Sequence, residues 1–140
     1  IGGARDIAIN GQGQIYIATA AGIYYNNNGY QNSWISFASG NYATVTCGRV
    51  SNIRAIDING NIFSFGIYRE QMPGSNGKDI NTAFDGQIWL TNSAGKISFL
   101  HYPSITTWKE IGGSDAVRIA AIRSKVMIVN TEGEVYKLEY

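Results

Sequence analysis

The residues that could perform chemistry in this 140-residue sequence are few, and their spacing matches no catalytic set. His101 is the single histidine and Cys47 the single cysteine, so the sequence has neither a multi-histidine metal motif nor a CxxC motif. A catalytic triad needs a base held against a nucleophile by a third group, whereas His101 beside Tyr102 and Pro103 is more typical of a turn. The sequence therefore predicts no catalytic residue, no bound metal and no cofactor.

Paired carboxylates could in principle hydrolyse a glycosidic bond. The aspartates of this sequence mostly flank turns or strand starts, where hydrogen bonds to nearby backbone amides explain them without catalysis. They are Asp6, Asp57, Asp79, Asp85 and Asp115. Gly11-Gln12-Gly13 is interpreted as a turn rather than a phosphate-binding loop, because neither a helix nor a lysine follows it. We therefore expect the protein not to be an enzyme.

Aromatic side chains favour a binding function instead. Nine tyrosines and three tryptophans supply flat apolar faces with a polar edge, which suit the C–H face and the hydroxyl rim of a sugar. Asn, Gln and Ser add neutral hydrogen-bonding groups. The side chains that we predict to contact a ligand are Tyr16, Tyr25, Tyr30, Arg69, Trp89, His101 and Tyr102.

The overall composition indicates a folded domain and excludes some partners. Hydrophobic residues make up 44% and charged residues 15%, and the net charge is +1 without a block of like charges. These values argue against a nucleic-acid or an anionic-membrane partner. The sequence has no apolar run long enough to span a bilayer and no signal-like start, and Ile1 in place of methionine suggests a processed, trimmed or engineered chain. The compartment is unknown from these features; a glycan-binding role leans towards a secreted or cell-surface location.

The elements that must position these side chains are β-strands. Apolar and polar residues alternate with a period of two in many short segments, and no segment has a helical period. Asn10-Gly11, Asn59-Gly60 and Asp85-Gly86 separate such segments and are strong hairpin signals, since type I′ turns need positive φ.

A repeat links these strands. In the second strand of each unit Ile15, Ile53, Ile88 and Val126 are spaced 38, 35 and 38 residues apart, and in the third strand Ile23, Ile62, Ile97 and Val135 are spaced 39, 35 and 38 apart. A unit of this length with up to four strands is typical of a propeller blade. We predict an all-β fold, a small propeller of about four blades. A two-sheet sandwich is the alternative, but it gives no reason for a fixed repeat.

The predicted domain spans residues 1–140, with repeats at approximately 4–40, 41–77, 78–113 and 114–140, the last joined by 1–3. The fourth repeat ends without an outer strand, and Ile1-Gly2-Gly3 resembles the end of "WKEIGG" in the third. We expect residues 1–3 to supply the missing strand, so that the N- and C-terminal strands close the ring. The alternative is that these residues were cut from a longer propeller.

The phrase "W-x-x-I-G-G", a short gap, "V-R-I-A" and two "G-x-[IV]-[YW]" strands resemble the tectonin repeat of tectonins, fish-egg lectins and a horseshoe-crab lectin. Residues 1–40 and 78–113 match best, whereas the second repeat departs and has Met72 where tryptophan is expected. Members of that family are usually six-bladed. The resemblance implies a carbohydrate-binding protein that recognises bacterial lipopolysaccharide or methylated glycans in defence.

We therefore predict a lectin with several repeat-related sites, because weak sites on a rigid ring gain affinity for a multivalent surface. The alternative is a protein-interaction scaffold, whose signature is one larger exposed apolar patch. Loops 24–32 and 101–107 occupy the same connection in two repeats, and the second repeat offers Tyr68 and Arg69 there. We expect Trp89→Ala to weaken sugar binding and leave the fold intact. A pair of chains is compatible with so small a ring.

Overall fold

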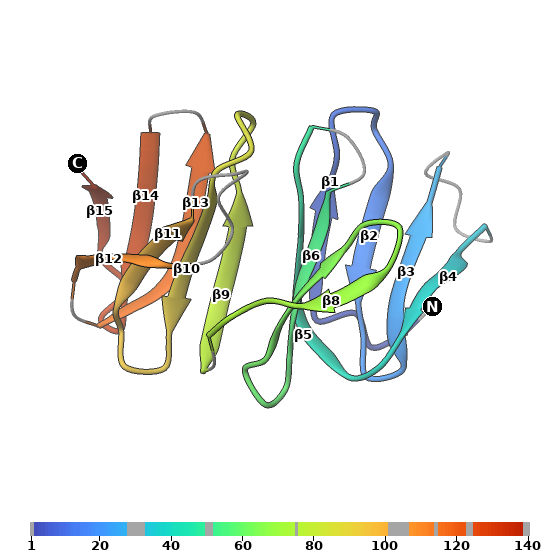
Figure 1. Ribbon diagram of the computed structural model, residues 1–140, viewed down its shortest axis with the longest axis horizontal. Helices are drawn as coiled ribbons and strands as arrows, with labels where there is room; N and C mark the ends of the chain where they lie inside the picture. The colour runs from blue at the N-terminus through green and yellow to red at the C-terminus, as the bar shows by residue number, and fades with distance from the viewer. Residues whose placement is uncertain are drawn as a thin grey trace.

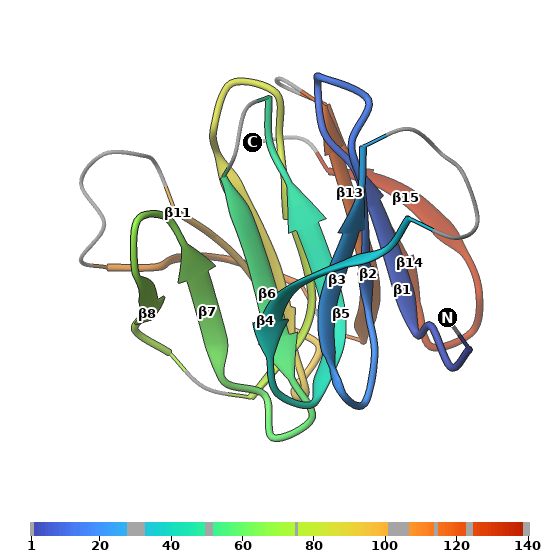
Figure 2. The same cartoon turned by 90° about the vertical axis from the view of Figure 1, so that its right-hand side faces the viewer.

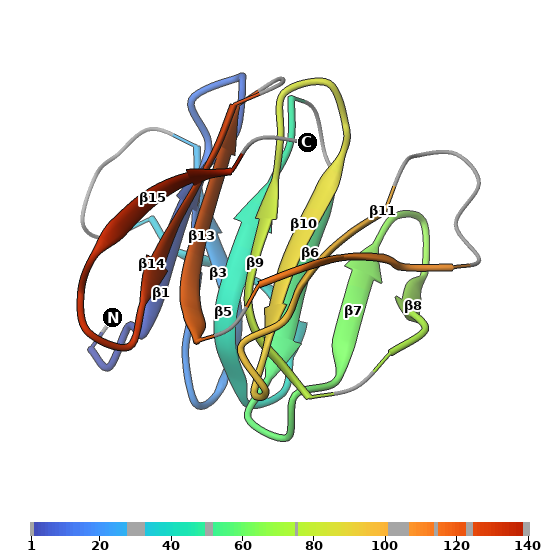
Figure 3. The same ribbon diagram turned by 90° about the vertical axis from the view of Figure 1, so that its left-hand side faces the viewer.

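The structure is a computed structural model that describes residues 2–27, 33–49, 52–74, 76–100, 107–113, 115–122 and 125–138. The described residues form fifteen strands in four antiparallel sheets, each a blade of a four-bladed β-propeller. Figures 1, 2 and 3 show the blades as successive layers, with β1, β5, β9 and β13 as their inner strands. The predicted all-β propeller of four blades is confirmed.

Each sheet is ordered as its strands follow in the chain. The first blade contains β1 (Asp6–Ile9), β2 (Ile15–Ala18), β3 (Gly22–Asn26) and β4 (Ile35–Ser39). The second contains β5 (Tyr42–Cys47), β6 (Ile53–Asp57), β7 (Ile62–Phe65) and β8 (Arg69–Gln71). The third contains β9 (Gly77–Thr82), β10 (Ile88–Asn92), β11 (Ile97–Leu100) and β12 (Lys109–Gly112). The fourth contains β13 (Ala116–Ile122), β14 (Lys125–Asn130) and β15 (Val135–Leu138).

One local device turns the chain between the second and third strands of three blades. Asp57, Asn92 and Asn130 each accept hydrogen bonds from the backbone amides two and four residues later, at 2.9–3.0 Å. A glycine with positive φ follows each of them by three residues, as at Gly60 (φ 82°) and Gly133 (φ 82°). A short polar side chain replaces a backbone acceptor in this way, so each of these turns is closed by hydrogen bonds within its own five residues.

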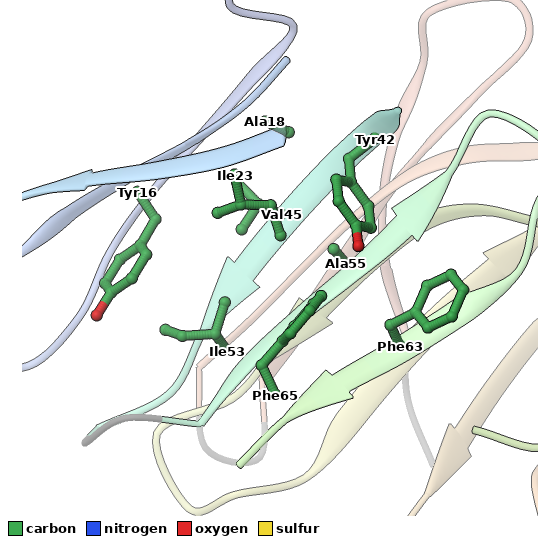
Figure 4. Packing of buried hydrophobic residues seen from close by; sticks show 9 residues of the cluster. All are labelled: Tyr16, Ala18, Ile23, Tyr42, Val45, Ile53, Ala55, Phe63 and Phe65. Atoms are coloured by element: carbon green, nitrogen blue, oxygen red, sulfur yellow. The ribbon is translucent and has the colours of Figure 1, made fainter. Parts of the chain in front are cut away.

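The hydrophobic core lies between the blades and is divided into three clusters. The first and second blades share an aromatic cluster that includes Tyr16, Tyr42 and Phe65 (Figure 4). Ile56, Leu90 and their neighbours fill the joint between the second and third blades, and Met72 takes part there. Trp89 and Ile119 belong to the cluster between the third and fourth blades. Each sheet is therefore stabilised by the blade beside it, since a single blade cannot bury both of its faces.

The N-terminal residues do not complete the fourth blade. Gly2 and Gly3 lie in no strand, Ile1 is outside the described residues, and within the described chain β15 pairs with β14 alone. Arg5 explains the difference, because its guanidinium donates to Asn41 Oδ1 at 2.6 Å and to the Tyr42 carbonyl at 3.2 Å, which holds the start of the chain against the second blade. Figure 1 shows the two termini at opposite ends of the long axis. In the described residues no strand of the first blade packs extensively against a strand of the fourth.

Candidate binding site

The hairpin that joins β7 to β8 presents an apolar tip to solvent. Phe65 pairs with Arg69 across the hairpin, and Gly66 N donates to the Tyr68 carbonyl at 3.2 Å, which closes a tight three-residue turn. This geometry leaves Ile67 93% and Tyr68 76% exposed. Single exposed apolar side chains are ordinary on protein surfaces, but two adjacent large ones at a hairpin tip indicate a contact surface. Figures 2 and 3 show β8 at the outer edge of the molecule, away from the inner strands.

Two cavities flank this tip. One, of about 380 Å³, lies between the tip and β4 of the first blade and is lined by Phe37 and Arg69 among others. The second, of about 520 Å³, lies between the tip and the third blade, with Met72 and Ile88 in its lining. Pockets that hold small ligands or side chains of a partner have volumes of this order. Tyr68 lines both cavities, so it stands at the centre of the site.

Arg69 joins the site through its aromatic neighbours. Its guanidinium carbon lies 4.0 Å from the centroid of the Phe63 ring and 5.9 Å from that of Tyr42. Stacking on the ring face fixes the cation while its N–H groups remain directed along the plane of the guanidinium, where a ligand can accept from them. Burial raises the pKa of the Tyr42 phenol, and the charge of Arg69 partly offsets that rise. Of the predicted ligand contacts, Arg69 is the exposed residue that the structure places in this site.

The larger cavity combines apolar and polar walls. Its polar lining comes from Asn52, Arg54, Ser64, Glu70 and Gln71. Arg54 is buried, and its Nη1 donates to Thr82 Oγ1 of the next blade at 3.2 Å. A ligand in this cavity would meet these hydrogen-bonding groups together with Tyr68, Met72 and Pro73.

Tyr16 and Tyr25 lie behind the site and not at its surface. Their rings stack with centroids 5.8 Å apart, and the Phe37 ring meets that of Tyr16 edge-on at 5.6 Å. Tyr16 is only 5% exposed, and burial raises the pKa of its phenol. The two tyrosines thus support Phe37, which lines the smaller cavity, but Tyr16 itself is too buried to contact a ligand in this structure.

Trp89 is fully buried, at 0% exposure, in the joint between the third and fourth blades. Its ring stacks on Phe99 with centroids 5.2 Å apart. The structure therefore assigns Trp89 to packing, which corrects the expectation that Trp89→Ala would affect sugar binding and leave the fold intact. Alternation along the strand points the Trp89 side chain at the fourth blade. The repeat in the sequence does not show which face of the third blade the fourth blade covers.

The remaining predicted contacts, Tyr30, His101 and Tyr102, lie outside the described residues. Phe37 and Ile67 belong to the site but were not predicted. The signal that could have found Ile67 is its position beside Tyr68 directly after Gly66, where a hairpin turn is normally polar.

Other chemistry is sparse in the described part of the chain. There, no group of three or more His, Cys, Asp or Glu side chains is placed to hold a metal ion. Burial raises the pKa of the Cys47 thiol to about 11, which keeps it protonated and unreactive near neutral pH. The described residues also contain no helix with the length and apolar character needed to cross a membrane.

Comparison with known proteins identifies the fold. No protein-family model and no curated protein matches the sequence. Among solved structures, the β-propeller domain of Cps50 (Swd1) from Myceliophteria thermophila matches 96% of this chain with a TM-score of 0.73 at 8% identity. The chain spans about half of that domain, 51% of its length.

Two further structures show the same architecture. The extracellular domain of the hybrid two-component system BT3049 from B. thetaiotaomicron matches 97% of this chain, and 20% of its own, with a TM-score of 0.75 at 15% identity. The computationally designed Ika4 protein matches 96% of this chain and 89% of its own, with a TM-score of 0.65 at 12% identity. At these identities the likeness establishes the propeller fold and no shared activity.

Proposed function

We propose that the protein is a non-enzymatic binding module that uses the β7–β8 hairpin to hold a partner protein. A propeller fold supports this role in general, because it presents rigid loops and hairpins around a ring. The observation that carries the proposal is the tip itself, where Ile67 and Tyr68 stand exposed between two cavities. Tyrosine and arginine are enriched among the residues that dominate protein interfaces, and Tyr68 and Arg69 are adjacent here.

The distribution of aromatic residues also favours one contact surface over several equal sites. Tyr16 and Trp89 occupy the same repeat position in the first and third blades, and both are buried in joints between blades. The exposed Tyr68 ring lies instead in the second blade, and the cavity that it lines reaches Phe37 of the first blade. One apolar patch of this kind is the expected signature of an interaction scaffold.

A carbohydrate ligand is the second candidate, and the lining of the larger cavity favours it. An exposed tyrosine ring beside amide, hydroxyl and carboxylate groups is the combination that binds a sugar's apolar face and its hydroxyls. The resemblance to tectonin repeats suggests the same ligand class, namely methylated glycans or lipopolysaccharide. In this proposal the protein is a lectin of the tectonin type with its main site at the hairpin.

One experiment tests both candidates on the same variants. The purified protein is screened against a displayed peptide library and a glycan array, and binders are measured again with Tyr68→Ala. Tyr136→Ala is the matched control, because Tyr136 is also an exposed tyrosine, 48% exposed, but lies on β15. Saturable peptide binding that Tyr68→Ala abolishes and Tyr136→Ala preserves supports the scaffold, and the same pattern with glycans supports the lectin. Binding that survives Tyr68→Ala, or no binding by folded protein, contradicts the proposed site.

A further inference from the structure

The inner strand of each blade has an apolar residue at an equivalent position. The exposed fraction of its side chain shows whether another blade packs on that face. The strand registers align Ile7, Val45, Ile80 and Ile119, each of which lies opposite the second strand at the same step. Val45, Ile80 and Ile119 are 3%, 3% and 5% exposed, because each packs against the blade before its own. Ile7 in the first blade is 62% exposed. The residue type is nearly constant, so the missing neighbour explains the difference.

Hydrogen bonds show that the joints run head to tail. Asp6 Oδ2 accepts from Val45 N at 2.8 Å, and Asp79 Oδ2 accepts from Ile119 N at 2.9 Å. One step further along the strands, Thr46 Oγ1 accepts from Thr82 N at 2.9 Å and Asn81 Oδ1 from Ala121 N at 3.0 Å. In each case a side chain of one inner strand accepts from a backbone amide of the next blade's inner strand. The two faces of a blade are therefore different, and each fits the opposite face of a neighbour.

The two end blades expose the two halves of one more joint. The free face of the first blade presents Ile7 and Ile9, 62% and 63% exposed. On the free side of the fourth blade Met127 is 41% exposed, although its counterpart Trp89 in the third blade is 0% exposed. Val135, on the neighbouring strand beside Val129, is 62% exposed. At the equivalent positions of Ile7 and Met127 in the other blades, a neighbouring blade covers the side chain.

We propose that a second copy of the chain covers both faces, with the fourth blade of each copy packed on the first blade of the other. A head-to-tail contact closes into a ring when the rotation between units fits, and two copies need only one kind of joint. The four blades match 51% of the length of the Cps50 propeller domain, which leaves room in a ring of that kind for further blades. Two copies of this chain would supply eight blades. A second copy fits because it supplies both kinds of face. The internal joints already pack the face of one blade that precedes the joint against the face of the blade that follows it.

The joint between copies is held mainly by apolar contact. At the positions of Asp79 and Asn81 the fourth blade has Arg118 and Ala120, and neither side chain accepts a hydrogen bond. Instead, Arg118 Nη1 lies 3.7 Å from Asp79 Oδ1 of its own chain. The dimer should therefore dissociate on dilution, unlike the internal joints, which stay closed within one chain.

Cysteine cross-linking tests the geometry directly. In a Cys47→Ser background, Ile9→Cys and Ala120→Cys are made in separate chains, because the equivalent pair, Ala121 and Asn81, meets across the internal joint between the third and fourth blades. Mixing the two variants under mild oxidation should give a covalent heterodimer, whereas neither variant alone should cross-link. Ile58→Cys mixed with Ala120→Cys is the control, since Ile58 is 55% exposed but lies in the turn after β6.

Mass and a double variant complete the test. Light scattering should give the mass of two chains at high concentration and one chain on dilution, and Ile7→Asp should abolish the dimer without altering the circular dichroism spectrum. The double variant Ile9→Cys with Ala120→Cys should form a cross-linked dimer. A single-chain mass at every concentration, species larger than two chains, or a disulfide within one chain would each overturn the proposal.

Discussion

Trp89 and Met127 occupy the same position in successive blades, and their surroundings differ completely. Each lies on the second strand of its blade, opposite Asn81 and Ala120 respectively. Trp89 is sealed between two blades at 0% exposure, whereas Met127 is 41% exposed. At this position burial is thus decided by the joint with the following blade and not by the strand that carries the residue.

Trp89→Ala should destabilise the fold far more than Met127→Ala. Removing a fully buried aromatic side chain costs about 3–5 kcal/mol, because a cavity remains where the ring was. Met127→Ala in the monomer should cost less than about 1 kcal/mol, as expected at a partly exposed site. Urea unfolding at a dilution where the chain is monomeric gives both free energies of unfolding. Equal losses would show that the fourth blade's free face is covered within the chain.

Asp79→Ala should have the second largest effect. Asp79 is 8% exposed and accepts from the buried Ile119 amide, so truncation leaves that amide without an acceptor, at about 1–3 kcal/mol. Arg118→Ala is the comparison, because it removes the other partner of Asp79 from an exposed position, where an ion pair contributes about 0–1 kcal/mol. The same urea titration separates the two. A larger loss for Arg118→Ala would mean that the charge and not the amide holds the joint.

The pH dependence of stability should reveal the burial of the Asp79 carboxylate. Burial raises the pKa of Asp79, an effect that the Ile119 amide and Arg118 reduce and that the charge of Asp6 reinforces. A raised folded-state pKa means that the folded protein favours the protonated acid. Its contribution to stability is therefore full below the unfolded pKa of about 4 and is lost as the pH rises through the folded value.

Asp79→Asn removes this loss and keeps an oxygen that can accept from Ile119 N. The free energy of unfolding of the variant, relative to the wild type, should therefore increase as the pH rises through that range. Thermal unfolding measured at a series of pH values provides the comparison, with Asp85→Asn at an exposed turn as the control. A difference that stays flat with pH would contradict the raised pKa.

The sequence predicted the blades but not the surfaces between them. Spacing of the strands and turn signals such as Asn59-Gly60 are local, so four repeats could be counted without knowing any long-range contact. Exposure is not local, because Ile7 and Ile80 look alike in sequence and differ only in the blade that precedes them. The hairpin site was missed in part for the same reason, since Phe37 meets Phe65 only when two blades pack together.

The smallest predicted effect sharpens the opening comparison by making the fourth blade resemble the third. Ala120 is exposed and occupies the position of Asn81, whose Oδ1 accepts from the amide of Ala121 in the next blade. Ala120→Asn would give the fourth blade an acceptor for the Ile9 amide of a second copy.

One net hydrogen bond at an accessible joint contributes about 0.5–1 kcal/mol, so the dimer dissociation constant should fall about two- to fivefold for each joint. Sedimentation over a dilution series measures that constant. Ala120→Ser should act in the same direction, because a hydroxyl at the equivalent position, that of Thr46, accepts from Thr82 N at 2.9 Å across the joint between the second and third blades. An unchanged constant for Ala120→Asn would mean that the fourth blade meets its neighbour in a register different from that of the third.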